Sequence, residues 1–313
     1  MTATIAVVIP TYNRAGYLVT AIDSALAQSR APDEIVVVDD GSTDDTAAVV
    51  ARYGPKIRYV RKDNGGEASA RNRGVREAGA TWIAFLDSDD AWEPEALERL
   101  EAAARSYPDA GLIAMRARVL SADGARTRRI YGKKSPGPRF STRSLLWGDA
   151  GGVQMPMVRR ALILAAGGFD ESLPSATDCD LWLRLSFTTG MVAIPEPLLL
   201  VRVHPDNLSA DRTLNARCWI RILEKLAREH PEFLSGSPWH YRRALGKERL
   251  RLGRELLASS AGDPARIGES RTTLRASIAA FPFFGRAWIY LLWSIVAPGS
   301  YAAFRRIERR AKG

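Results

Sequence analysis

Short runs of β-branched residues alternate with longer amphipathic stretches over the first 110 residues, and this alternation limits the possible folds more than any other feature. Strands that are buried on both faces are continuous apolar runs, and the stretches between them have the length of crossover helices. The pattern predicts an α/β fold around a mostly parallel sheet. The expected strands are Ile5–Ile9, Glu34–Asp39, Ile57–Arg61 and Thr81–Asp87, and the expected helices cover residues 15–28, 43–53 and 67–78.

The pattern changes after residue 110, which divides the chain into three parts. An expected hairpin pairs Leu112–Leu120 with Arg126–Tyr131, and the prolines of the extended segment Met191–Val203 indicate an edge or irregular strand. We expect residues 1–110 and 111–210 to form an α/β half and an α+β half of one domain. Residues 211–313 are expected to form a basic, helical C-terminal region.

The net charge of +10 is distributed unevenly along the 313 residues. The three parts carry 12 basic and 18 acidic residues (−6), 13 and 8 (+5), and 20 and 9 (+11). A basic C-terminal region suits nucleic acid, an anionic membrane surface or an acidic polymer, and charge alone does not choose among them.

The two cysteines and three histidines lack zinc-finger spacing, which argues against a structural zinc module. We recognise no signal peptide at the N-terminus. We therefore expect a cytoplasmic protein.

An uncharged stretch of 18 residues, Ala287–Phe304, is near the lower limit for a membrane span but is interrupted at Pro298. Aromatic residues lie beside arginines throughout 281–313, as in segments that lie at a membrane interface. We therefore expect peripheral contact with a membrane through 281–313, at the inner face of the cytoplasmic membrane. Packing of these helices on the protein itself is the alternative.

Polar residues follow every expected strand, and ligands of open parallel sheets bind at the carboxyl ends of the strands. The most concentrated example is Asp87-Ser88-Asp89-Asp90, whose crowded carboxylates call for a cation or a ligand. Mg²⁺ commonly takes one or two carboxylates together with ligand phosphates. The chain has neither a Walker A pattern nor a Gly-x-Gly-x-x-Gly fingerprint, so bound phosphates would need a metal and an arginine. Arg71 is the candidate arginine. The alternative interpretation of Arg71 is an ordinary charge on the surface of a helix.

Taken together, five motifs resemble the family 2 glycosyltransferases, which have the glycosyltransferase A-type, Rossmann-like fold. The resemblance covers roughly residues 4–205. It rests on residues 8–14 (VIPTYNR), 37–44 (VVDDGSTD), 70–74 (ARNRG), 85–90 (FLDSDD) and 178–184 (DCDLWLR). It implies transfer of a sugar from a nucleotide donor to an acceptor hydroxyl with inversion at the anomeric carbon, in the synthesis of a cell-surface glycan or glycolipid.

The resemblance also implies roles for residues on the nucleotide side. Pro10, Thr11 and Tyr12 correspond to the segment that lines the base pocket, and Asp39 to the carboxylate that accepts a hydrogen bond from the base imide. This favours UDP or dTDP as the nucleotide of the donor. Arg71 corresponds to an arginine that contacts the nucleotide.

A divalent metal, Mn²⁺ or Mg²⁺, is the cofactor that the resemblance implies. Asp87 matches the first acid of the Asp-x-Asp motif, near the ribose, Ser88 is a supporting residue, and Asp89 matches the acid that ligates the metal. His204 falls where family members often carry a histidine near the diphosphate or metal. A loop histidine is as readily a structural hydrogen-bonding group, so both roles of His204 stay open.

The general base must lie behind the attacking hydroxyl, and Asp178 is the candidate. The family usually has Glu-Asp at this turn, and Thr177 replaces the Glu here, which affects contacts on the acceptor side. Asp180 is the competing carboxylate, although a first-turn helix charge explains it equally well.

Other functions are open at this stage. A nucleotidyltransferase would want a glycine-rich, basic loop after the first strand, whereas residues 10–14 hold one arginine and no glycine. A non-catalytic nucleotide-sugar-binding scaffold at a membrane is a second alternative. Nucleic acid is not an expected partner, because the C-terminal aromatic residues form one block instead of interleaving with arginines.

Overall fold

The computed structural model describes residues 3–121, 124–131, 138–147, 154–204, 207 and 211–301. The turn of the hairpin expected between Leu120 and Arg126 includes residues 122 and 123, which lie outside the described residues. The chain divides into two compact units, one of Met1–Leu173 and Thr177–Asn207, the other of Pro174–Ala176 and Leu208–Gly313.

The first unit alternates strands and helices in its N-terminal half. Its elements are β1 (Ile5–Thr11), α1 (Ala15–Leu26), β2 (Glu34–Asp39), α2 (Thr46–Ala51), the 3-10 helix η1 (Gly54–Lys56), β3 (Arg58–Arg61), α3 (Glu67–Glu77) and β4 (Trp82–Phe85). They continue with β5 (Ala91–Trp92), α4 (Ala96–Ser106), β6 (Ala110–Leu120), β7 (Arg126–Tyr131), β8 (Arg139–Phe140), α5 (Thr142–Trp147), β9 (Gln154–Arg159), α6 (Arg160–Ala165), α7 (Thr177–Leu185) and β10 (Gly190–Arg202).

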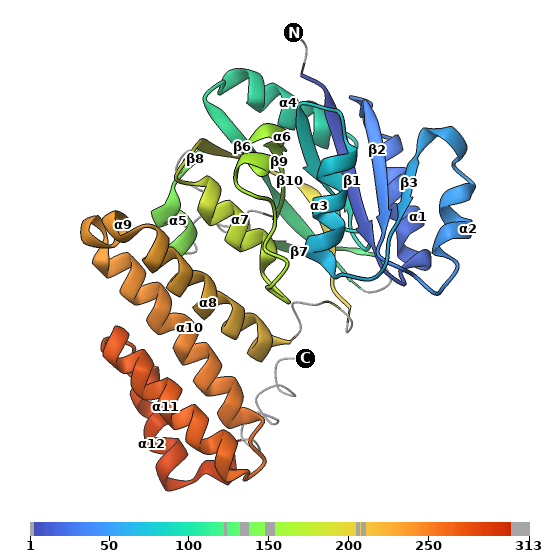
Figure 1. Cartoon of the computed structure of the whole chain (residues 1–313). Helices are drawn as coiled ribbons and strands as arrows, with labels where there is room; N and C mark the ends of the chain where they lie inside the picture. The colour runs from blue at the N-terminus through green and yellow to red at the C-terminus, as the bar shows by residue number, and fades with distance from the viewer. Residues whose placement is uncertain are drawn as a thin grey trace. The chain divides into compact units, whose positions relative to one another are not determined.

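Within the described residues these strands form one ten-stranded sheet (Figure 1). The order is β3-β2-β1-β4-β9-β6-β10-β5, with β7 on β6 and β8 on β10. The pairs among β1 to β4 are parallel, and β10 is parallel to β6, whereas β9 runs antiparallel to both its neighbours. The expected α/β fold is confirmed, and so is the antiparallel hairpin of β6 and β7.

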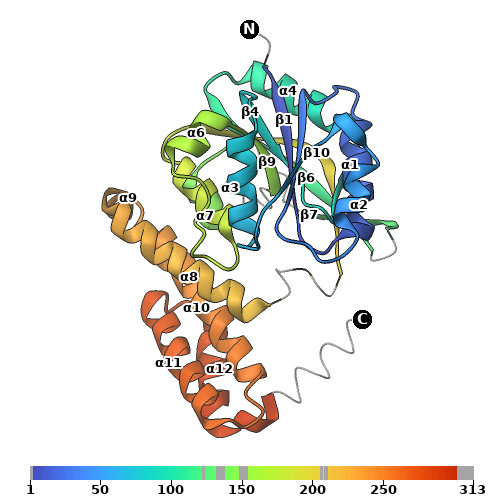
Figure 2. The ribbon, with the colours of Figure 1, turned by 45° about the vertical axis from the view of Figure 1, so that its right-hand side comes forward.

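The chain reverses its winding direction after β3, and this places helices on both faces of the sheet. α1 and α2 lie together on one face, while α3 packs on β1 and β2 from the other, beside α6 and α7 (Figure 2). A right-handed crossover from β3 back to β4 requires this change of face. All seven residues of β1 and all four of β4 are buried, so the centre of the core lies where the two helical layers meet the sheet.

β10 is an interior strand, with β6 on one side and β5 and β8 on the other, and not the edge strand that its prolines suggest. Its pairing with β6 is interrupted between Ile194 and Leu199. Because Pro195 and Pro197 lie in this interruption, their missing N–H groups cost the β6 ladder no hydrogen bond. The expectation of an irregular strand is therefore confirmed.

Gly74 lets α3 approach the sheet. A Cβ atom at this position would overlap Cγ1 of Val8 on β1 and lie 3.3 Å from Cγ2 of Val38 on β2. This close approach sets the distance between α3 and the strands β1 and β2.

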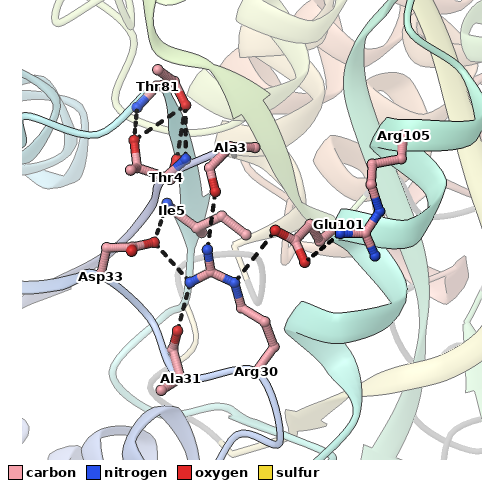
Figure 3. A network of polar contacts seen from close by, with 9 residues as sticks. All are labelled: Ala3, Thr4, Ile5, Arg30, Ala31, Asp33, Thr81, Glu101 and Arg105. Atoms are coloured by element: carbon pink, nitrogen blue, oxygen red, sulfur yellow. Dashed lines mark hydrogen bonds and ion pairs between the residues drawn. The ribbon is translucent and has the colours of Figure 1, made fainter. Parts of the chain in front are cut away.

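Arg30, in the loop between α1 and β2, ties the amino end of β1 to its surroundings (Figure 3). Its guanidinium donates hydrogen bonds to the carbonyl oxygen of Ala3 (3.0 Å) and to Asp33 Oδ2 (2.7 Å), and it pairs with Glu101 of α4 at 3.6 Å. Asp33 Oδ2 also accepts a hydrogen bond from the backbone N–H of Ile5. This network anchors β1 at the end of the sheet opposite the polar loops.

The second unit is helical in its described part. Its elements are α8 (Arg212–Glu229), α9 (Pro231–Gly236), α10 (Pro238–Ala258), α11 (Pro264–Ala280) and α12 (Gly285–Val296). α10 and α11 cross closely because Ser270 and Ser277 donate 2.7 Å hydrogen bonds to the carbonyl oxygens of Gly253 and Gly246. A search of the described residues finds no helix that is both long and apolar enough to cross a membrane.

We predict that Gly74→Ala destabilises the protein by about 1–2 kcal/mol. The overlap with Val8 costs roughly 1–3 kcal/mol, which exceeds the gain in helix propensity. Gly16→Ala is the matched control, since that helical glycine has no atom within 4 Å of its added Cβ. The measurement is the midpoint of urea unfolding; equal midpoints for Gly74→Ala and the wild type would disprove the close contact.

Candidate functional site

The polar loops expected at one edge of the sheet do lie there. The ladder of β1, β2 and β3 ends with Thr11 opposite Asp39 and Asp39 opposite Arg61, so the three strands finish in one row. The N–H of Leu86, after β4, continues the same ladder by donating to the carbonyl oxygen of Val8. The loops that follow β1, β2, β3 and β4 therefore emerge side by side at the carboxyl edge.

Arg71 is the centre of the site. It lies on α3 with its side chain 2% exposed, and its Nη2 atom is 2.7 Å from Glu67 Oε1 and 2.8 Å from Asp87 Oδ1. Its Nη1 atom donates to Thr177 Oγ1 at 3.4 Å, and its guanidinium lies over the ring of Phe169 at 5.5 Å from the centroid. Arg71 is thus not a surface charge, and it joins three segments that are far apart in the sequence.

The charge on Arg71 persists although burial opposes it. Removal from water lowers the pKa of Arg71, but the nearby carboxylates of Glu67, Asp87 and Asp178 outweigh this and raise it overall. The contribution of Asp178 means that its carboxylate lies within electrostatic range of Arg71.

Glu67 is a site residue that the sequence analysis missed. Loss of hydration is the main reason why the pKa of Glu67 is raised to about 7; Arg71 opposes the shift, and Asp87, Asp178 and Asp89 add to it. The sequence could have identified Glu67, because it lies four residues before Arg71 on an expected helix and side chains at i and i+4 are neighbours.

The Asp87–Asp90 turn lies beside this arginine. Burial raises the pKa of Asp87; Arg71 opposes the shift, and Asp89 adds to it. Asp90 is buried, and burial together with Asp87 and Asp89 raises its pKa well above the usual value. Its Oδ1 atom accepts a 2.9 Å hydrogen bond from the backbone N–H of Arg202, while Ser88 is buried in the same turn.

Asp89, the expected metal ligand, and His204, the second candidate, are direct neighbours. His204 Nε2 is 2.9 Å from Asp89 Oδ2, and the imidazole stacks on Tyr17 with ring centroids 5.1 Å apart. The buried Nδ1 atom of His204 has no hydrogen-bond partner among the described residues. One carboxylate and one imidazole at a strand end fit a hard divalent ion that completes its shell with phosphate and water oxygens.

A complete protein-made metal cage is absent from the part of the chain that the structure describes. No group of three or more His, Cys, Asp or Glu side chains there could hold a metal ion. Any ion at Asp89 and His204 would therefore depend on ligand oxygens for the rest of its coordination.

The residues of the expected base pocket lie at the ends of β1 and β2. Thr11 is 4% exposed, and its Oγ1 atom has no hydrogen-bond partner among the described residues, whereas Tyr12 is 47% exposed beside it. Pro10 is buried in β1. Asp39 is fully buried and accepts hydrogen bonds from the Ser42 N–H (2.7 Å) and the Tyr59 hydroxyl.

Asp40 organises the loop after β3, a role that the sequence did not indicate. Its Oδ1 atom accepts a hydrogen bond from the N–H of Gly65 (3.0 Å), and its Oδ2 atom accepts one from the N–H of Gly66 (2.7 Å). Lys62 pairs with the same carboxylate. Because Gly66 is the N-cap of α3, Asp40 sets where the helix that carries Arg71 begins.

Asn72 attaches the segment before α7 to α3. Its side chain accepts a hydrogen bond from the N–H of Phe169 (2.8 Å) and donates one to the carbonyl oxygen of Phe169 (3.0 Å). Gly168 has φ +79°, and a Cβ there would overlap Asn72 Oδ1. This position therefore needs glycine for both its backbone conformation and its space.

Asp178 and Asp180 occupy the first turn of α7 but have different surroundings. Asp180 is 2% exposed, and its Oδ2 atom accepts hydrogen bonds from Arg184, which also donates to the carbonyl oxygens of Ala166 and Gly168. Asp178 is only half-buried. The structure thus gives Asp180 a part in holding α7, whereas the charge of Asp178 acts on Arg71.

Comparison with known proteins adds to this geometry. A family model described as Glycosyl transferase family 2 matches residues 6–161. A glycosyltransferase of Rickettsia prowazekii (strain Madrid E), described as uncharacterized, is 31% identical over 245 residues, covering 74% of this chain and 76% of the relative. Chondroitin synthase of Pasteurella multocida (strain Pm70) is 34% identical over 185 residues, which are 58% of this chain and 19% of that protein.

A solved structure of similar fold is that of S. aureus TarS 1–349 in complex with UDP-GlcNAc. The TM-score is 0.69 at 19% sequence identity, and the match covers 97% of this chain and 92% of that one. At this identity the likeness concerns the fold.

We predict that Glu67→Gln changes how stability depends on pH. A pKa of about 7 in the folded protein against a usual value of 4.5 means that the folded state binds the Glu67 proton more tightly, so the wild type loses stability as pH rises from 4.5 to 7. Gln carries no such charge, and the variant should gain roughly 1 kcal/mol or more over the wild type across this window.

Urea unfolding midpoints at the two ends of the window measure the effect. Glu77→Gln, on the same helix, is the matched control for loss of a paired carboxylate. Parallel pH profiles of Glu67→Gln and the wild type would show that Glu67 titrates normally.

Proposed function

The chain belongs to glycosyl transferase family 2, and we propose that it is an inverting, metal-assisted transferase that moves a sugar from a nucleoside-diphosphate sugar to an acceptor hydroxyl. The observation that carries the proposal is the buried Arg71, which gathers Glu67, Asp87 and Thr177 next to the Asp89–His204 pair. Family membership removes the nucleotidyltransferase alternative.

UDP or dTDP is the proposed nucleotide of the donor. Thr11 Oγ1 is a buried polar atom at the strand edge without a hydrogen-bond partner among the residues that the structure describes, and Asp39 offers a buried carboxylate beside it. An imide N–H of uracil or thymine is a donor that such a carboxylate can accept. TarS, which shares the fold, was solved with UDP and with UDP-GlcNAc, and this supports a uridine donor.

Asp89 and His204 would hold a Mn²⁺ or Mg²⁺ ion, with the donor diphosphate completing its coordination. When bound, the ion supplies positive charge that stabilises the departing nucleoside diphosphate. Arg71 keeps Asp87 oriented at the same edge, and the buried Asp90 fixes the turn by its bond to the N–H of Arg202.

Asp178 is the proposed general base. A single displacement needs a carboxylate that removes the proton from the acceptor hydroxyl as it attacks. Asp178 is half-buried and its charge acts on Arg71, whereas Asp180 is engaged by Arg184. Thr177, in place of the usual acid, has its hydroxyl engaged by Arg71.

The proposed acceptor is a glycan or a lipid-linked glycan in the synthesis of a cell-surface polymer or glycolipid. It would be used in the cytoplasm or at the inner face of the cytoplasmic membrane. The chondroitin synthase relative acts in polymer synthesis by its name and supports this class of acceptor.

Calorimetric titration of UDP, dTDP, GDP and ADP, each with Mn²⁺ and with a chelator, tests the donor and the metal together. We expect binding of UDP or dTDP that weakens on chelation, and loss of the metal effect in Asp89→Ala. Asp109→Ala, an exposed carboxylate at the start of β6, is the control. Absence of nucleotide binding under every condition would favour a non-catalytic protein.

We predict that Asp178→Asn lowers turnover by about 10²- to 10⁴-fold while donor binding is retained, because the amide cannot accept the acceptor proton. Donor hydrolysis or transfer gives the turnover, and the same calorimetry gives binding. Asp180→Asn is the matched variant, expected to lower the unfolding midpoint by loosening Arg184. Normal turnover in Asp178→Asn would remove the base assignment.

A further inference from the structure

Within the described part of the chain, helix α12 carries an exposed apolar face. We call it the α12 face, and it consists of Trp288, Ile289, Leu292, Ile295 and Val296. Each of these side chains is more than half exposed, and Val296 reaches 73%. Large apolar side chains gathered at such exposure mark an interaction surface in soluble proteins.

The face is a continuous stripe and not a scatter of residues. Positions 288, 289, 292, 295 and 296 repeat with the period of an α-helix, so they line one side. The opposite side carries the buried Ala287 and Ser294, and the carbonyl oxygen of Ser294 accepts hydrogen bonds from Arg271 of α11. α12 packs on α11, as Figures 1 and 2 show. The side of α12 opposite Ala287 and Ser294 is the apolar, exposed one.

Aromatic residues extend the surface beyond the helix. Phe283, 73% exposed, lies 5.5 Å from Phe281 and 5.7 Å from Trp239 between ring centroids. Trp288 donates its indole N–H to the carbonyl oxygen of Pro282 at 3.0 Å. Tryptophan beside exposed aliphatic residues is typical of segments that lie where lipid meets water.

The charged side chains in the sequence stretch that contains the α12 face are all basic. No Asp or Glu occurs in the sequence between Glu269 and Glu308, while Arg275 and Arg286 are exposed. An anionic partner would meet no repulsion along this stretch and would gain from the arginines. The segment therefore combines an apolar face with a basic flank, which is the pattern of helices that bind in the plane of a membrane.

The length of α12 excludes a span. Its 12 residues make a helix of ~18 Å, against the ~30 Å of the hydrocarbon core. A helix of this length can place one face among the upper acyl chains while its buried side stays on α11.

We propose that the α12 face is a docking surface for a lipid bilayer that carries anionic head groups. A second copy of the chain is a poorer occupant, because it brings the same arginines to the rim and no carboxylate from this segment to pair with them. The proposal does not rest on the transferase activity, since it concerns the second unit and is measured without donor or acceptor.

Co-sedimentation of the full chain with vesicles tests the proposal. Vesicles of phosphatidylcholine and phosphatidylglycerol in equal parts should carry the protein down at low salt, and vesicles of phosphatidylcholine alone should carry down much less. Leu292→Glu should lower the partition coefficient about 10-fold or more, because it places a charge on the apolar face. Leu164→Glu, at an exposed leucine of α6, is the matched control and should bind as the wild type does.

A second pair of variants separates charge from apolar contact. Arg275→Gln with Arg286→Gln should weaken binding to the anionic vesicles and leave the small binding to phosphatidylcholine unchanged. Circular dichroism and the unfolding midpoint verify that every variant is folded. Vesicle binding by Leu292→Glu equal to that of the wild type would overturn the proposal.

The molar mass in solution, measured by light scattering, tests whether a second copy of the chain occupies the α12 face. We expect the same mass for the wild type and Leu292→Glu. A wild-type dimer that dissociates in Leu292→Glu, with no vesicle binding, would assign the α12 face to self-association and refute lipid docking.

Discussion

The site depends on one buried cation. Without the guanidinium of Arg71, Glu67 and Asp87 would meet as like charges at the end of β4, and Thr177 would lose its partner from α3. Removing one partner of a buried ion pair strongly destabilises a protein, because it leaves the other charge buried and uncompensated. Neighbouring residues of the same helix complete the arrangement, since Asn72 holds the segment before α7 and Gly74 sets the distance to β1 and β2. The placement of the other site residues therefore depends on the position of α3.

Negative charge exceeds positive charge at this edge of the sheet. The pKa values of Glu67, Asp87 and Asp90 are all raised, with burial as the first cause and neighbouring carboxylates contributing to each. Such a cluster lowers its free energy when a cation arrives, and this agrees with the proposed role of Asp89 and His204. Under the proposed assignment the protein would supply two of the ligands and the donor the remainder, so metal and nucleotide would bind better together than apart.

Sequence alone indicated the fold and the edge at which the chemistry lies, because strand runs and the polar residues after them are local patterns. The burial of Arg71 was not readable, since it depends on Phe169 and Thr177, which are about a hundred positions away along the chain. Pairing of Asp89 with His204 spans 115 positions, and no local pattern encodes such a contact. The prolines of β10 correctly indicated an irregular strand, but they could not show that an interrupted ladder accommodates them in the interior of the sheet.

Asp89, Arg71 and Asn72 contact residues that are far away in the sequence, and this limits how far the chain can be shortened without loss of the site. The family match ends at residue 161, whereas the partners of these three side chains are His204, Thr177 and Phe169. A chain shortened to 161 would keep β1 to β4 but leave a buried amide and a buried guanidinium without their far partners, each at a cost of about 1–3 kcal/mol. The segment by which the family is recognised is therefore shorter than the segment that must fold as one piece.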